Sequence, residues 1–292
     1  MAWDLDQIAD DGGRFAILAI DQRATLRGML FKAGAPSADA DLSTFKVDVV
    51  RALSPLASGV LIDVEYGLDA VRAAGVLDRR AGLLVASERS PHPTWYGEPR
   101  VQYSPADRGP AFAAAHGANA LKFLLRWQPD RRAGPGEPDL AAEAVDAVRA
   151  VIADCRAHGM PSVIEPLVTS ARSSTAVIRS AELLAALGPD LLKLEWPGDA
   201  DGCRELSKAC GTVPWALLSG GVDYRTFVDR VLTAVDAGAC GYIGGRAFWG
   251  DAVTLTGADR RGYLENTAAQ RMTDLNAMIA GRGRSWREVA GR

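Results

Sequence analysis

The sequence has no long apolar run and no excess of basic charge. Apolar stretches such as residues 81–86 are far shorter than the roughly 20 residues that a membrane-spanning helix needs. The first residues are acidic and lack the apolar segment of a secretory signal, so we expect a cytoplasmic protein. The 33 basic residues are balanced by 36 acidic ones, which is not typical of a nucleic-acid-binding protein. We therefore expect neither a membrane nor a nucleic acid as a partner.

Histidine and cysteine are also scarce. The three histidines, at positions 92, 116 and 158, are far apart in the sequence, and no two of the four cysteines have C-x-x-C spacing. A zinc site built from several imidazoles is therefore not expected, and we interpret the cysteines as small core residues. Carboxylates could still hold Mg²⁺.

Lysine is the rarest charged residue, with only five among the 33 basic residues, at positions 32, 46, 122, 193 and 208. Two of them, Lys122 and Lys193, lie inside apolar, strand-like segments. Arginine keeps its proton at neutral pH, whereas lysine can lose it, so chemistry that requires a free amine requires lysine. The presence of these two lysines in apolar strands therefore calls for a specific reason.

Apolar, β-branched segments alternate with helical segments along the chain. The predicted strands are residues 15–21, 59–63, 82–88, 120–127, 162–167, 191–196, 215–219 and 241–245. The predicted helices are residues 42–53, 105–116, 140–158, 174–186, 202–210, 223–237 and 259–280. Eight strand-and-helix units predict a (β/α)8 barrel that forms a single domain over residues 1–292. An open, doubly wound sheet is the alternative, but no G-x-G-x-x-G motif follows the first strand.

Polar residues gather where the predicted strands end, which is where such barrels carry their chemistry. Lys193 has two interpretations, a buried ion pair or an amine that forms a Schiff base, and burial with Lys122 as a second nearby cation would favour the free amine. Glu165 precedes Pro166, which restricts it to extended conformations, and it is either a proton shuttle or the ion-pair partner of a lysine. Asp21 would be the next carboxylate around the rim.

Glycine-rich turns follow the last two predicted strands. Ser219 and Gly220 follow one strand, and Gly245 and Arg246 follow the other, which is the usual place for a phosphate pocket in this fold. The alternative is that these glycines only form turns. Three further carboxylates are either metal ligands or rim groups paired with arginines, and we favour the arginine pairs. They are Asp63, Glu65 and Glu88.

These motifs together resemble the class I (Schiff-base) aldolases of the tagatose-1,6-bisphosphate aldolase family. The matching stretches are LAIDQR at 18–23, FKV at 45–47, ALSP at 52–55, LKFLL at 121–125, IEP at 164–166, LKLE at 192–195, LSGGV at 218–222 and GRAFW at 245–249. The resemblance implies that Lys193 forms the Schiff base, that Glu165 transfers protons, and that Lys122 and Asp21 shape the site. It also implies roles in substrate binding. Ser219, Gly220, Gly245 and Arg246 would hold the phosphate of dihydroxyacetone phosphate, and Gln22 and Arg23 would receive the anionic far end of the ketose.

The motifs are divided between two branches of that family. Residues 33–36, 45–47, 52–55 and 164–166 resemble sulfofructosephosphate aldolases, whereas residues 63–68, 82–84, 274–276 and 285–286 resemble the tagatose-bisphosphate branch. We expect cleavage of 6-deoxy-6-sulfofructose 1-phosphate to dihydroxyacetone phosphate and sulfolactaldehyde. Tagatose 1,6-bisphosphate is the alternative substrate, which would give glyceraldehyde 3-phosphate.

Two other classes stay open, a metal-dependent barrel lyase that uses Asp63, Glu88 and Glu165, and a barrel that binds a sugar phosphate without catalysis. For the aldolase we expect no cofactor and no metal, a sugar phosphate as the small-molecule partner, and a homo-oligomeric assembly.

Overall fold

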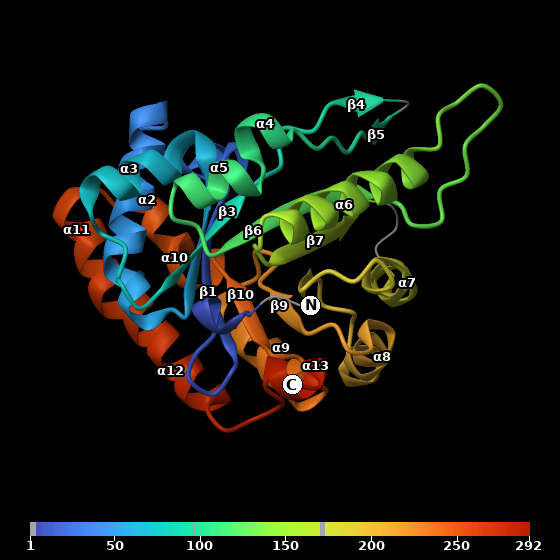
Figure 1. Ribbon diagram of the computed structural model, residues 1–292. Helices are drawn as coiled ribbons and strands as arrows, with labels where there is room; N and C mark the ends of the chain where they lie inside the picture. Colours follow the sequence, from blue (N-terminus) through green and yellow to red (C-terminus); the bar gives the residue numbers. More distant parts are fainter. Residues whose placement is uncertain (1–3, 96, 170–172) are drawn as a thin grey trace.

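The computed structural model describes residues 4–95, 97–169 and 173–292. In these residues eight parallel strands close into a barrel in the order β1-β10-β9-β8-β7-β6-β3-β2, with helices around it (Figure 1). The barrel strands are β1 Phe15–Ile20, β2 Gly59–Asp63, β3 Gly82–Ala86, β6 Ala120–Trp127, β7 Ser162–Val168, β8 Leu191–Leu194, β9 Trp215–Leu218 and β10 Gly241–Gly244. The predicted (β/α)8 barrel is confirmed.

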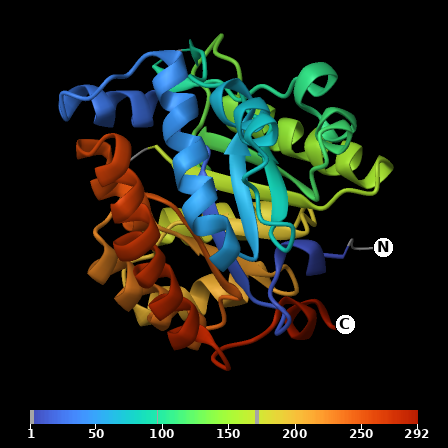
Figure 2. The same ribbon diagram turned by 90° about the vertical axis from the view of Figure 1, so that its left-hand side faces the viewer.

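The helices cover the outside of the barrel. They are α1 Ala24–Lys32, α2 Asp39–Leu53, α3 Asp69–Ala74, α4 Pro105–Arg108, α5 Pro110–Ala115, α6 Leu140–Ala157, α7 Ser174–Ala185, α8 Ala200–Cys210, α9 Tyr224–Asp236, α10 Arg246–Trp249, α11 Gly257–Tyr263, α12 Ala269–Ile279 and α13 Trp286–Ala290. Helix α2, from the first part of the chain, packs beside α11 and α12 from its last part (Figure 2). No helix of the described residues is both long enough and apolar enough to span a bilayer.

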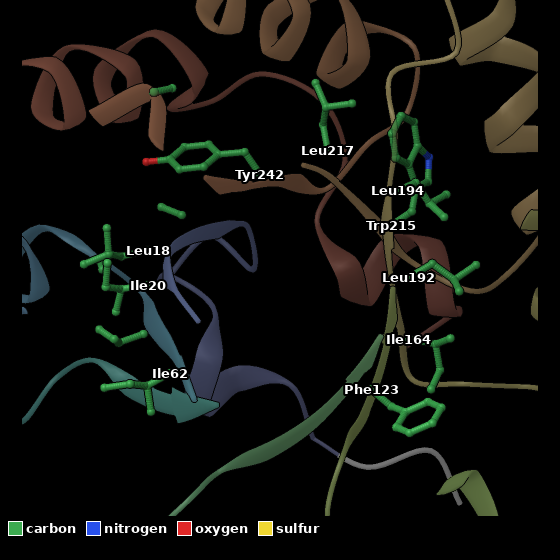
Figure 3. Close-up of a cluster of buried hydrophobic side chains, with 14 of the residues drawn as sticks. Leu18, Ile20, Ile62, Phe123, Ile164, Leu192, Leu194, Trp215, Leu217 and Tyr242 are labelled. Atoms are coloured by element: carbon green, nitrogen blue, oxygen red, sulfur yellow. The ribbon is translucent and has the colours of Figure 1, made fainter. Parts of the chain in front are cut away.

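Alternate side chains of each strand point to opposite faces, and this divides the core into two layers. The outward-facing residues pack against the helices, and Figure 3 labels ten of them, among them Leu18, Phe123 and Leu192. The inward-facing residues form a separate apolar cluster inside the barrel, which includes Ile17, Val163 and Leu191. Further along the strands, toward their carboxyl ends, the inward-facing side chains are polar.

The amino-terminal end of the barrel is closed by both ends of the chain. Leu5 and Ile8 belong to the interior apolar cluster, together with Trp286 of α13. The Trp286 Nε1 atom donates a hydrogen bond to Asp6 Oδ1 at 3.1 Å, which joins the two segments. The opposite end of the barrel, where the strands have their carboxyl ends, is the end that carries the cavities described below.

Two of the predicted helices are interrupted in the structure. The prediction of one helix over residues 105–116 is wrong, because α4 ends at Arg108 and α5 begins at Pro110. Gly109 between them has an extended backbone, and Pro110 has no N–H group to continue the helical hydrogen bonds. The predicted helix 259–280 is present, but it contains a π-helical turn, Leu264–Ala268, between α11 and α12.

The sequence also gave no prediction for a short antiparallel hairpin in the connection after β3. The hairpin consists of β4 Thr94–Trp95 and β5 Glu98–Pro99. Its Glu98 accepts hydrogen bonds from Gln128 at 2.6 Å and from Thr169 at 3.2 Å, in the segments that follow β6 and β7. The hairpin is therefore tied to the carboxyl end of the barrel.

Candidate active site

Two adjoining cavities lie at the carboxyl ends of the strands. The larger has a volume of about 480 Å³, and the smaller has a volume of about 170 Å³. Five residues line both cavities, namely Gln22, Glu165, Leu167, Lys193 and Arg246. Residues of β7 and β8 meet there with residues that follow β1 and β10, so the predicted site residues on distant parts of the sequence form one site.

Lys122 lies at the centre of a buried group of carboxylates. Its side chain is fully buried, and its Nζ atom lies 2.9 Å from Asp21 Oδ2, 3.1 Å from Glu88 Oε1 and 2.7 Å from Glu165 Oε2. Burial by itself lowers the pKa of Lys122, but the charges of Asp21, Glu165 and Glu88 outweigh burial and hold this pKa well above its usual range. Lys122 is therefore an ammonium ion at neutral pH and is poorly suited to act as a nucleophile.

Lys193 has a different environment. Its side chain is 5% exposed, and its Nζ atom lies 2.9 Å from Glu165 Oε2. The same carboxylate oxygen lies 2.7 Å from the Nζ atom of Lys122, so Glu165 bridges the two amines. Lys193 lines both cavities and its amine has access to a ligand, whereas Lys122 is buried behind the wall. The predicted ion pair is present, and it also places Glu165 where it can exchange a proton with Lys193.

Asp21 and Glu88 are the other two carboxylates around Lys122. Burial acts to raise the pKa of Asp21, but Lys122 and Lys193 hold this pKa well below its usual value. Burial likewise acts to raise the pKa of Glu88, but Lys122 and Arg23 together lower it. Both groups are therefore ionised at neutral pH, and the charges of the buried cluster compensate one another.

Arg23 lies in the wall of the larger cavity, but carboxylates already occupy its guanidinium group. Its Nη2 atom lies 2.6 Å from Glu88 Oε1, and its Nη1 atom lies 3.1 Å from Glu65 Oε2. Nη1 also donates to the backbone oxygen of Glu88 at 2.8 Å. Arg108 reaches the other oxygen of Glu65 at 2.9 Å. Glu65 and Glu88 are thus both paired with arginines, which was the favoured prediction, although Glu88 is buried instead of lying on the rim and also contacts Lys122.

Asp63 pairs with a lysine instead of an arginine, and this lysine was missing from the predicted site. Lys46 of α2 is fully buried, and its Nζ atom lies 2.6 Å from Asp63 Oδ1. It also donates to the backbone oxygens of Ile20 at 2.6 Å and Gln22 at 2.8 Å, on either side of Asp21. Lys46 therefore fixes the backbone that presents Asp21 and Gln22.

The helical pattern contained a signal for Lys46. Residues 42, 45, 49 and 53 form the apolar face of α2, and position 46 falls on that face. A lysine there, in a chain with so few lysines, could have been singled out by the same reasoning as Lys122. Among the described residues, no three His, Cys, Asp or Glu side chains form a group that could hold a metal ion.

The smaller cavity contains the predicted phosphate-binding residues. Ser219, Gly220 and Arg246 line it beside Lys193. Gly245 lies behind this wall, and its N–H group donates to Ser219 Oγ at 3.5 Å, which connects the turns after β9 and β10. A Cβ atom at Gly245 would lie 2.3 Å from the backbone oxygen of Ala19, so this close approach requires glycine.

Two buried polar atoms at this cavity have neither a hydrogen-bond partner nor an ion-pair partner in the described structure. They are Oε1 of Gln22 and Nε of Arg246. Buried polar atoms are nearly always satisfied in native proteins, and an unsatisfied pair beside a cavity indicates a polar ligand. A positive guanidinium, a hydroxyl and backbone N–H groups form a suitable site for a phosphate.

Comparison with known proteins agrees with this geometry. The family model described as DeoC/LacD family aldolase matches residues 15–251, and the chain belongs to this family of class I aldolases, which are lyases. The tagatose 1,6-diphosphate aldolase 1 of Streptococcus mutans serotype c is 27% identical, and the match covers 97% of both chains. The tagatose 1,6-diphosphate aldolase of Listeria innocua is also 27% identical, over 94% of this chain and 90% of the relative.

Solved structures share the fold. An archaeal fructose 1,6-bisphosphate aldolase superposes with a TM-score of 0.68 at 18% identity, covering 95% of this chain and 98% of the other. A Schiff-base-forming fructose-1,6-bisphosphate aldolase superposes with a TM-score of 0.64 at 17% identity, covering 94% and 98%. At these identities the similarity establishes the barrel and does not assign the substrate.

Proposed function

We propose that the protein cleaves a ketose 1,6-bisphosphate of the tagatose type through a Schiff base on Lys193, and releases dihydroxyacetone phosphate and glyceraldehyde 3-phosphate. The observation that carries this proposal is the contrast between two buried lysines that share one carboxylate. Lys122 is held as a cation by three carboxylates, whereas Lys193 contacts Glu165 and opens into both cavities. The amine of Lys193 is therefore the one that a ketone in the cavity can reach and with which it can form a Schiff base.

The first half of the reaction forms the imine. Glu165 accepts a proton from Lys193, and the free Nζ atom attacks the C2 carbonyl of the ketose to give a carbinolamine. The proton then passes from Glu165 to the carbinolamine hydroxyl, which leaves as water. The contact of 2.9 Å between Glu165 Oε2 and Lys193 Nζ supports both proton transfers.

The second half breaks the C3–C4 bond. Glu165, again a carboxylate, removes the proton of the C4 hydroxyl. The C3–C4 electron pair then moves into the iminium group, and the aldehyde leaves. The resulting enamine takes up a proton at C3, and water hydrolyses the imine to regenerate the amine and release dihydroxyacetone phosphate. Lys122 keeps Glu165 and Asp21 in place, and the pocket of Ser219, Gly220 and Arg246 holds the C1 phosphate.

The relatives named above act on the tagatose bisphosphate, and this favours a C6 phosphate over the sulfonate that the sequence motifs led us to expect. A turnover comparison of tagatose 1,6-bisphosphate, fructose 1,6-bisphosphate and 6-deoxy-6-sulfofructose 1-phosphate tests this choice. A clear preference for the sulfonate would reverse it.

Borohydride reduction in the presence of substrate tests the Schiff base. We expect a covalent adduct on Lys193, identified by peptide mass spectrometry, and no adduct in Lys193→Arg, which keeps the charge but has no free amine. The exposed Lys208 provides the matched control, because Lys208→Arg should still be trapped. Full turnover by Lys193→Arg or Lys193→Ala would refute the proposal.

A further inference from the structure

Arg126 lies on β6, on the same inward-facing side as Lys122. Phe123, Leu125 and Trp127 of this strand belong to the outward-facing core, so residues 122, 124 and 126 face the interior. Arg126 lies four residues after Lys122, which is a distance of about 13 Å along β6. Arg126 therefore lies above the buried cluster, in the lining of the larger cavity and at its exposed mouth.

Two other arginines that line the larger cavity are engaged by carboxylates. Arg23 pairs with Glu65 and Glu88, and Arg89 lies 2.5 Å from Asp107. Arg126, in contrast, makes no ion pair and no hydrogen bond with the residues that the structure describes. An unpaired guanidinium in a cavity wall is available to an anionic ligand.

The barrel order places Arg126 on the far side of Lys193 from the phosphate pocket. Strand β8, which carries Lys193, lies two strands from β6 in one direction and two strands from β10 in the other. Arg246 begins α10 directly after β10, and it too has no ion-pair partner in the described residues. Two unpaired guanidinium groups thus flank the reactive amine, one on each side.

We propose that Arg126 binds the anionic group at the far end of the ketose and sets the preference of the enzyme for a substrate with two charged ends. This assignment rests on the proposed function, and it gives to Arg126 the role that the family resemblance suggested for Arg23. With Arg246 on the C1 phosphate and the C2 carbonyl at Lys193, the rest of the sugar extends toward β6. Ser90 and His92, from the connection after β3, add polar groups to the same wall.

The test is the ratio of kcat/KM for tagatose 1,6-bisphosphate to kcat/KM for tagatose 1-phosphate. We expect Arg126→Gln to lower this ratio about tenfold, which is the lower end of what a hydrogen bond to a charged group contributes, because Arg126 is exposed. Most of the loss should appear as a higher KM for the bisphosphate. Arg126→Lys should retain part of the preference, since it keeps the charge and loses the planar fork.

Arg132, an exposed arginine that does not line the cavity, supplies the matched control, and Arg132→Gln should leave the ratio unchanged. The 6-deoxy-6-sulfofructose 1-phosphate arm distinguishes a phosphate from a sulfonate as the far-end group. An unchanged ratio in Arg126→Gln, including the case in which kcat/KM falls equally for both tagatose substrates, would overturn the role of Arg126. It would leave the proposed aldolase activity intact. Failure of the wild type to cleave any of these substrates would instead refute the proposed function, and with it this assignment.

Discussion

Replacing Lys122 by methionine tests the buried charge cluster most directly. The substitution keeps an unbranched side chain of similar length but removes the one cation that contacts Asp21, Glu88 and Glu165. Removing one partner of a buried ion pair costs about 3–5 kcal/mol of unfolding free energy, because the remaining charge is left uncompensated. Asp21 loses its ion-pair partner here, whereas Glu88 keeps Arg23 and Glu165 keeps Lys193, so we expect a loss within that range and not above it. For a chain of this size the Tm should fall by roughly 6–15 °C.

The pH dependence of this loss identifies its cause. In the wild type the pKa values of Asp21 and Glu88 are lowered, so their contribution to stability is present at neutral pH and is lost as the pH falls below their unfolded values of about 4. In Lys122→Met, burial without this cation raises both pKa values. The folded variant then binds protons that its unfolded state does not, and its stability rises as the pH is lowered from about 7 to about 5.

Thermal unfolding of both proteins across that pH range measures the effect. The difference in Tm between wild type and Lys122→Met should be largest near neutral pH and should narrow toward pH 5. Lys208→Met is the control, because Lys208 is exposed and its loss should change the stability by no more than about 0.5 kcal/mol. A Tm of Lys122→Met equal to that of the wild type, or a difference independent of pH, would refute the electrostatic account of the cluster.

Three further predictions concern the backbone and the absence of a required metal. Lys46→Met should lower the unfolding free energy by about 3–5 kcal/mol and should also lower kcat. The double variant Lys46→Met/Asp63→Leu should recover the stability but not kcat, because no group then holds the backbone on either side of Asp21. A double variant as active as the wild type would contradict the positioning role. Gly245→Ala should raise the KM and lower the Tm measured by thermal unfolding, because its Cβ atom would lie 2.3 Å from a backbone oxygen. Gly28→Ala is the control and should change neither quantity, because the space around Gly28 is open. Activity should persist after dialysis against EDTA, and a loss that Mg²⁺ restores would favour the metal-dependent alternative.

The sequence alone determined the barrel, because its strand and helix signals are local. The strands 59–63 and 120–127 were predicted with the observed ends, and the apolar surroundings of Lys122 and Lys193 marked both as unusual. Five other strands were predicted one or two residues too long, as at Asp21 and Glu88, and β7 was predicted one residue too short, because it ends at Val168. Asp21 and Glu88 lie beyond the last residue of each strand that pairs with a neighbouring strand, and this pairing is not visible in one segment of the sequence.

Only the tertiary structure decided which charges meet. Closing the barrel brings Asp21, directly after β1, and Lys122 of β6 within 2.9 Å, although they are 101 residues apart in the sequence. The same closure occupies Arg23 with Glu65 and Glu88, and leaves Arg126 unpaired within the described residues. Coulombic contacts depend on distances across the sheet, and these distances follow from strand order and stagger. Residue type and spacing in the sequence could therefore predict which ionisable groups belong to the site but not which groups pair.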